Sequence, residues 1–188
     1  MSAASASPYS QCPVYETQSF RLRLVEPDDA EALLACYSDP AVRPLFNSDN
    51  CHHSFVCSTR ADMRHIIDMW LSEYRQEHYV RFSLIDKSTG KAAGTLECFA
   101  WPQPIESVGK LGLLRLDLAS RLETAEALRE LVQLVDSRLF DLFGVNGMLT
   151  KAVPEATERI AVLTDEGYRP DSSGAVPYPH YYLKLLPR

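Results

Sequence analysis

Two groups of side chains in this 188-residue sequence are of types that carry out chemistry. The first is Cys51, His52, His53 and Cys57, whose thiol and imidazole groups are ligands that zinc prefers. Their spacing matches no common zinc finger and no second cluster completes a ligand set, so we predict no metal site. A Cys51 or Cys57 nucleophile beside a histidine is the other interpretation, but no Asn or Asp with an evident orienting role lies nearby.

The second group consists of charged residues inside apolar segments. In the segment 111–118, Leu114, Leu116 and Leu118 lie on one face, and Arg115 and Asp117 lie on the other. Glu97 lies in the preceding apolar segment. Carboxylates on neighbouring strands can share a proton-transfer task, which makes Glu97 and Asp117 candidate catalytic residues. The alternatives are a salt bridge on a partly solvated face for Asp117 and a surface or hairpin position for Glu97.

Apolar periodicity predicts the elements that must position these groups. Strands are expected at 20–24, 80–85, 92–99, 111–118, 148–153 and 181–186, with one more possible near Tyr168. Helices are expected at about 30–37 and 63–74, over five turns ending before Gly144, and at 155–166. Strands that alternate with helices predict an α+β (mixed α/β) fold, in which helices pack on a mixed sheet.

Composition limits the class of protein. Hydrophobic residues make up 46% and charged residues 23% of the chain, which is typical of a globular domain. We predict a flexible N-terminal tail at 1–18 and a single domain at 19–188. A net charge of −6 argues against nucleic acid as the main partner. The lack of a long apolar run argues against a membrane span, and five cysteines without a secretory signal favour the cytoplasm.

The order of elements resembles the GNAT superfamily of acyl-CoA N-acyltransferases, and local sequences carry the same resemblance. Phe20-Arg21-Leu22-Arg23-Leu24, Glu26-Pro27-Asp28-Asp29-Ala30 and Tyr37-Ser38-Asp39-Pro40 resemble the opening of the branch that acetylates ribosomal-protein N-termini. The segment 85–96 resembles the central hairpin of the family, and 163–168 resembles its closing helix. The resemblance covers about residues 20–186 and implies a mostly antiparallel sheet of six to seven strands with about four helices.

The resemblance also implies a reaction and a site. Acetyl-CoA would be the co-substrate, without a metal, and its acetyl group would pass directly to a primary amine in a cleft between the fourth and fifth strands. Glu97 or Asp117 would be the general base, the loop 47–58 would shape the acceptor pocket, and Tyr181 or Tyr182 would be the acid. The residues implied for the cofactor are Leu116, Leu118, Ala119, Ser120, Arg121, Leu122, Glu123 and Thr124.

The sequence departs from the family pattern in the pyrophosphate turn and in the last helix. Leu122 and Thr124 occupy the two positions where the family has Gly or Ala, and Glu123 adds a negative charge beside an anion site. Arg121 can offset part of that charge. The usual Asn and Tyr of the last helix fall at Ala156 and Leu163. The segment 120–123 also matches a capping box, which would start a helix and can coexist with the binding role.

We therefore predict an acetyl-CoA-dependent N-acetyltransferase, monomeric or homodimeric, that acts on a peptide N-terminus or a small-molecule amine. The degenerate turn leaves a second prediction open, a non-catalytic module with the same fold and an eroded CoA site. A third, an unrelated transferase or hydrolase, would use Cys51 or Cys57 as its nucleophile.

Overall fold

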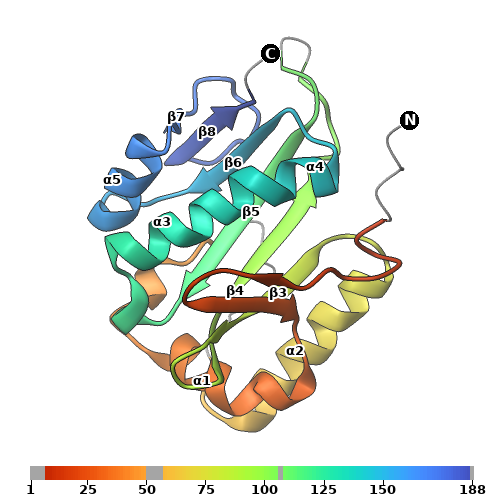
Figure 1. The fold of residues 1–188 in the computed structure, drawn as a ribbon, viewed down its shortest axis with the longest axis vertical. Coiled ribbons are helices and arrows are strands. Elements are labelled where there is room, and N and C mark those ends of the chain that lie inside the picture. Colours follow the sequence, from red (N-terminus) through yellow and green to blue (C-terminus); the bar gives the residue numbers. More distant parts are fainter. Residues whose placement is uncertain (1–6, 50–56, 106–107, 187–188) are drawn as a thin grey trace.

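An eight-stranded mixed sheet organises the chain. The structure is a computed structural model that describes residues 7–49, 57–105 and 108–186 (Figure 1). The strands are β1 (Tyr15–Glu16), β2 (Phe20–Leu24), β3 (Val80–Asp86), β4 (Lys91–Ala100), β5 (Leu111–Leu118), β6 (Gly147–Lys151), β7 (Arg169–Pro170) and β8 (Tyr181–Leu185). Their order is β1-β2-β3-β4-β5-β6-β8-β7, and every neighbouring pair is antiparallel except β5 and β6.

The helices are arranged as the mixed fold class predicts. They are α1 (Ala30–Ser38), α2 (Arg60–Arg75), α3 (Ala125–Leu134), α4 (Phe140–Phe143) and α5 (Thr157–Asp165). A π-helical segment, Val135–Leu139, joins α3 to α4. The predicted fold class is confirmed, but the sheet has eight strands where six to seven were expected. β7 is the strand given as possible near Tyr168, and the additional one is β1, whose two residues are too few to show an alternating pattern.

Local sequence explains where the two longest helical stretches begin and end. At the start of α2, the Thr59 hydroxyl accepts from the Asp62 backbone N–H at 3.1 Å, and the Asp62 carboxylate accepts from the Thr59 N–H at 2.9 Å. The α3–α4 stretch ends at Gly144, whose φ of 59° is the left-handed conformation that glycine adopts without strain. The expectation that Gly144 ends this stretch is confirmed.

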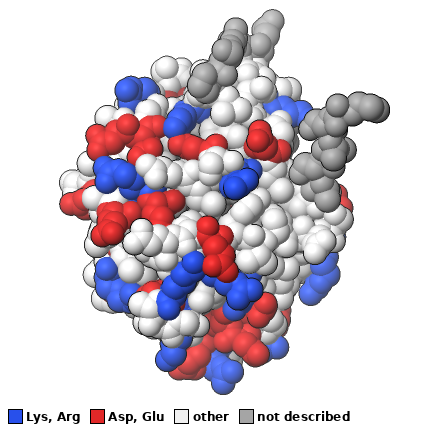
Figure 2. Space-filling model, in the orientation of Figure 1, with Lys and Arg blue, Asp and Glu red and all other residues white. Residues whose placement is uncertain are grey.

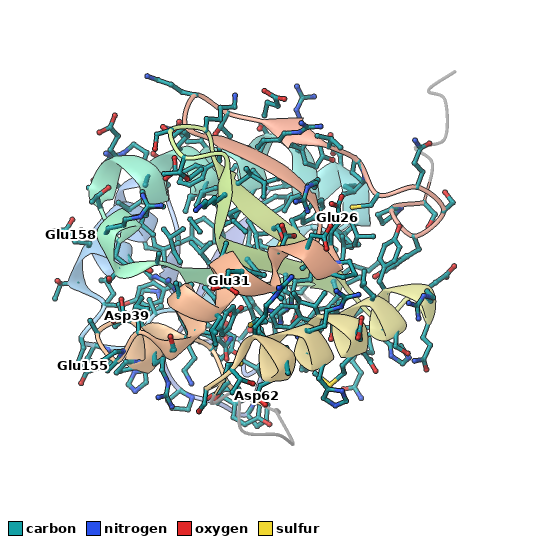
Figure 3. All side chains as sticks on the ribbon, turned by 90° about the horizontal axis from the view of Figure 1, so that it is seen from below. Glu26, Glu31, Asp39, Asp62, Glu155 and Glu158 are labelled. Carbon is teal, nitrogen blue, oxygen red and sulfur yellow. The ribbon has the colours of Figure 1, made fainter. Side chains whose placement is uncertain are left out.

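The two faces of the sheet carry different helices. Leu114, Leu116 and Leu118 of β5 join the core cluster that contains α3 and α5 residues. The helices α1 and α2 pack together and form a second cluster with sheet residues such as Ala92. Figure 3 shows α1 and α2 side by side, with Asp39 where α1 ends and Asp62 where α2 begins. No helix within the described ranges is long and apolar enough to cross a membrane.

The parallel pair β5–β6 is short. Its register runs from Leu111 opposite Gly147 to Leu114 opposite Thr150, whereas β5 continues to Leu118. After Leu114, β5 therefore pairs with β4 on one side, whereas on its other side no strand of the described residues pairs with it. This end of β5 is where the cleft is expected.

Part of the segment expected to be a tail makes contacts with the domain. The Tyr74 hydroxyl donates to the Pro8 carbonyl at 2.9 Å, and Tyr9 lies against the Tyr74 ring with centroids 5.9 Å apart. Residues 1–6 lie outside the described part of the chain.

Candidate active site

A buried polar cluster lies on the α1–α2 side of the sheet, and Arg81 of β3 is its centre. The Arg81 guanidinium lies 4.1 Å from the centroid of the Trp70 ring, donates to the Thr95 hydroxyl at 3.0 Å and pairs with the Glu97 carboxylate. Its side chain is 6% exposed. A buried cation of this kind is held by its partners and by the aromatic face rather than by water.

Asp117 joins this cluster from β5. Its Oδ2 accepts from the Tyr37 hydroxyl at 2.6 Å and lies 3.4 Å from Arg81 Nη1, whereas its Oδ1 has no hydrogen-bond partner among the described residues. Burial raises the pKa of Asp117 above its usual range, although Arg81 and Tyr37 oppose the shift. The alternative of a salt bridge with a neighbour across the sheet is confirmed by the contact with Arg81, but the expected partial solvation is wrong, because Asp117 is buried.

Glu97 is the other predicted base, and both of its oxygens are taken by arginines. Oε1 accepts from Arg115 at 3.1 Å, and Oε2 pairs with Arg81. The Glu97 side chain is 1% exposed, so the alternative of a surface position is wrong, whereas its place in the β3–β4 hairpin, opposite Arg81, is confirmed. The pattern of alternation could not show this, because it places a residue on a face without saying what covers the face.

A cavity of about 270 Å³ lies next to this cluster, on the same face of the sheet. Its lining combines aromatic rings with a few polar groups: Asp49, Phe99, Trp101, Pro102, Gln103, Leu113, Arg115, Val176, Tyr178 and Tyr181. Neither Glu97 nor Asp117 belongs to the lining, but Arg115, which contacts Glu97, does. A mostly apolar pocket with few convergent polar groups is typical of a small-molecule or side-chain binding site.

Asp49 is the carboxylate that lines this cavity among the described residues, and sequence analysis did not single it out. Its two oxygens accept from Lys151 Nζ at 2.7 and 2.8 Å, and its backbone carbonyl accepts from Arg115 at 2.7 Å. Lys151 belongs to β6 and Arg115 to β5, so Asp49 spans the place where these strands part. Only its position in the predicted acceptor loop could have drawn attention to it.

The remaining predictions for this loop have mixed outcomes. Asn47 donates to the Tyr181 hydroxyl at 2.9 Å, and burial raises the pKa of Tyr181 to about 12. Cys51, His52 and His53 lie outside the described residues. Cys57 is buried against Met63, and burial raises the pKa of its thiol, which disfavours the thiolate that a nucleophile requires. Among the described residues, no group of side chains could hold a metal ion.

The opposite face of β5 carries a much narrower slot, of about 20 Å³. It is lined by Leu114, Leu116, Leu128, Val132, Thr150, Lys151, Arg159, Val162 and Leu163. The Arg159 side chain of α5 reaches β5, where it donates to the Leu116 carbonyl at 2.7 Å. It also forms a bidentate ion pair with Glu123. Only 6% of this side chain is exposed. Sequence analysis did not single out Arg159, although it lies one helical turn beyond Ala156 and one before Leu163.

The turn predicted to bind pyrophosphate has its own set of contacts. Arg121 pairs with Asp86 at 2.7 Å, and the Ser120 hydroxyl donates to Asp39 at 2.5 Å. Leu122 packs on the core that contains α3. The predicted capping box at 120–123 is wrong, because Thr124 caps α3 by accepting from the Ala127 N–H at 3.4 Å.

Two other residues assigned to the cofactor are bound into the sheet. Leu118 is fully buried in the core, and the Ala119 N–H donates to the Ala93 carbonyl at 2.8 Å. Figure 2 shows acidic and basic side chains intermixed on the face that carries α3 and α5, so charge patterning alone does not mark this slot.

Comparison with known proteins identifies the fold. No family model and no curated protein matches the sequence. Among solved structures, the ribosomal-protein-S5-alanine acetyltransferase from Vibrio fischeri superposes with a TM-score of 0.67 at 16% identity, covering 92% of this chain and 96% of that one. RimJ from Mycobacterium smegmatis, solved with CoA-disulfide, has a TM-score of 0.70 at 14% identity, with coverages of 92% and 86%.

A third similar structure is a GNAT-family acetyltransferase from Bacillus anthracis. It superposes with a TM-score of 0.67 at 15% identity and covers 92% of this chain and 98% of that one. The match spans nearly the whole chain in each case. The chain has the GNAT acetyltransferase fold, as the resemblance predicted.

Proposed function

We propose that this protein is an N-acyltransferase that moves the acetyl group of acetyl-CoA to a primary amine, a peptide N-terminus or a small molecule. One observation carries the proposal. Beyond Leu114 and Thr150 the strands β5 and β6 no longer pair, and an aromatic-lined cavity with a few polar groups and a slot lie on opposite faces of β5 at this place. Structures of the same fold, one of them solved with CoA-disulfide, support this reading.

The residues at the slot fit the cofactor with one adjustment. The fork of Arg159 and the amino end of the ten-residue helix α3 supply the positive groups that a diphosphate needs. The side chain of Arg159 lines the slot and reaches the Leu116 carbonyl, and it can move by rotation about single bonds without a change of the backbone. Leu122 and Glu123 oppose close approach of an anion, so we expect weaker binding than a glycine turn would provide.

The cofactor would lie along β5 between Leu116 and Thr124, and when bound it supplies an activated acetyl group as a thioester. The chain supplies the rest of the chemistry. An amine in the cavity is protonated near neutral pH and must lose its proton before it can attack. Asp49 is the carboxylate that lines the cavity, and we propose that it contacts the ammonium group.

Glu97 and Asp117 remain proposed members of the proton-transfer machinery. Glu97 holds Arg115, which lines the cavity, so it acts on the acceptor through that guanidinium. Asp117 has a raised pKa and an oxygen without a partner in the described structure, two properties suited to receiving a proton. Both would then act behind Asp49 and not in contact with the amine.

Ligand binding followed by turnover tests the proposal. CoA or acetyl-CoA at 100 times its dissociation constant should stabilise the fold by about 2.7 kcal/mol, which raises Tm by roughly 5–10 °C for a domain of this size. Release of free thiol should then be measured with a panel of peptide N-termini and small amines. Asp49→Asn should lower kcat/KM at least tenfold, whereas Asp68→Asn, an exposed carboxylate on α2, should leave it unchanged.

The outcomes separate the candidate functions. A shift in Tm with turnover that depends on Asp49 supports the acyltransferase. A folded protein with no shift at millimolar acyl-CoA overturns it and leaves the non-catalytic module of the same fold. Turnover that thiol alkylation abolishes would instead favour the cysteine nucleophile.

A further inference from the structure

We propose that Arg159 closes the cofactor slot by pairing with Glu123, and that it exchanges Glu123 for the phosphate groups of the cofactor when the slot opens. We call Arg159 in this role the pin. This inference rests on the proposed function and concerns how the same site is entered. Arg159 would then be a cofactor-binding residue, and Glu123 would be its partner while the cofactor is absent.

The position of Arg159 is the first argument. Ala156, Arg159 and Leu163 follow one another at intervals of three and four residues, so they share one face of the α5 segment, and all three are buried. Arg159 is the long side chain of the three, and it reaches the Leu116 carbonyl just beyond the last paired residues of β5 and β6. It therefore occupies the place that the splayed strands would otherwise leave open.

The chemistry of the ion pair is the second argument. Nε and Nη2 of Arg159 both contact the Glu123 carboxylate, which is the two-pronged geometry that a guanidinium also makes with phosphate. Glu123 belongs to the turn that the resemblance assigns to pyrophosphate. The Glu123 carboxylate thus binds Arg159 where a phosphate group could bind it. An incoming diphosphate can replace the carboxylate, and Arg159 then supplies the positive charge that the diphosphate needs.

The available space is the third argument. The slot has about 20 Å³ free, enough for one water molecule and too little for a pantetheine arm. The Glu123 side chain is 11% exposed, so the ion pair lies at the edge of the slot, where release of Arg159 leaves Glu123 hydrated. Opening then requires a change of side-chain rotamer, and the strands can stay where they are.

Two ligands and four variants test the pin by calorimetric titration. CoA carries phosphates, whereas pantetheine has the same arm without them. Arg159→Gln should bind pantetheine more tightly than the wild type does, because the slot is open, and should lose the phosphate contact with CoA. The affinity ratio of CoA to pantetheine should therefore fall at least tenfold. Glu123→Gln should bind both ligands about three- to tenfold more tightly, because Arg159 is released at lower cost.

The double variant Glu123→Gln/Arg159→Gln removes both charges together, so it keeps the test valid if a single variant leaves a poorly folded chain. It should show the reduced ratio of Arg159→Gln. Arg159→Lys, which keeps the charge and loses the fork, should give an intermediate ratio. Circular dichroism and Tm without ligand check that each variant is folded.

Failure of the pin and failure of the proposed function give different results. If the wild type binds CoA and the ratio is unchanged in Arg159→Gln and in the double variant, the pin is overturned and the acyltransferase stands. If no folded variant, Glu123→Gln included, binds CoA at millimolar concentration, both are overturned. Weaker binding of both ligands to Glu123→Gln would also contradict the pin.

Discussion

The two faces of β5 each bury an arginine, and the two arginines are held very differently. Arg81 lies among Glu97, Asp117 and Thr95 with the Trp70 ring against it. Arg159 has one carboxylate and one backbone carbonyl, at the edge of a slot. A cation with several partners from different strands forms part of the framework. A cation with one carboxylate partner can exchange that partner more readily, so two arginines that are equally buried need not have the same structural role.

The largest expected effect tests this contrast by removing each guanidinium in turn. Arg81→Met leaves the carboxylates of Glu97 and Asp117 buried without their shared cation and should cost about 3–5 kcal/mol of unfolding free energy. Arg159→Met should cost less, about 1–3 kcal/mol, because Glu123 can be hydrated. Urea denaturation monitored by circular dichroism measures both.

Arg64→Met is the control for this pair, since Arg64 is half exposed on α2 and its change should stay within about 0.5 kcal/mol. If Arg81→Met and Arg159→Met lost the same unfolding free energy, the two arginines would not differ in the way that their contacts suggest.

A second, smaller effect sharpens the contrast through pH. Burial raises the pKa of Asp117, so its contribution to stability is complete below the ordinary pKa of an aspartate, near 3.8, and is lost as pH rises through the raised value. Relative to Asp117→Asn, the wild type should therefore lose unfolding free energy with rising pH, by at most about 1.4 kcal/mol per pH unit. Urea titrations from pH 4 to pH 8 give the slope.

Asp29 is the matched control, because it is also a buried aspartate but has the opposite shift. Burial opposes ionisation there, yet hydrogen bonds from Arg23 and Ser83 outweigh it and lower the pKa. Its contribution is present above the ordinary aspartate pKa and is lost as pH falls below it. Relative to Asp29→Asn, the wild type should thus gain unfolding free energy as pH rises, over a range that extends down to about pH 2 because the shifted pKa lies below the ordinary one. Slopes of the same sign for Asp117 and Asp29 would be inconsistent with these environments.

The smallest expected effect concerns the start of α3 beside the slot. Thr124→Ala removes the hydroxyl that caps the helix and should cost about 1 kcal/mol. Ser120→Ala should change the unfolding free energy much less, because Ser120 precedes the helix and is only hydrogen-bonded to the exposed Asp39. The same denaturation measurement compares the two. A larger loss for Ser120→Ala would restore the capping box that the sequence suggested.

The sequence predicted the elements well and their surroundings poorly, for a physical reason. Periodicity is local, so the segment 111–118 could be recognised as a strand with Arg115 and Asp117 on one face. What covers that face depends on α1, more than 70 residues away along the chain, whose Tyr37 contacts Asp117. The burial of Glu97 and Asp117 was therefore beyond reach, although their residue types drew attention to the right place.

The missed residues follow the same rule. Asp49 and Arg159 lie in segments that were assigned correctly, a loop and a helix, but their importance comes from partners on other elements. The departures at Ala156 and Leu163 were visible in the sequence, whereas the Arg159 side chain that lies between them was not singled out. Residues that depart from a family motif show that a site has changed, but they do not show which other side chain now lies there.

The single parallel pair of the sheet has a consequence for how the chain folds. Strands β1 to β5 lie beside one another in chain order and are all antiparallel, whereas β6 joins through a crossover that includes α3. Crossover contacts close a longer loop, so β1–β5 can assemble first and β6–β8 dock onto the finished edge. We expect amide hydrogens of β6 and β8 to exchange with solvent sooner than those of β3 and β4. The β5–β6 pair, which borders the slot, is then the last strand pair to form during folding.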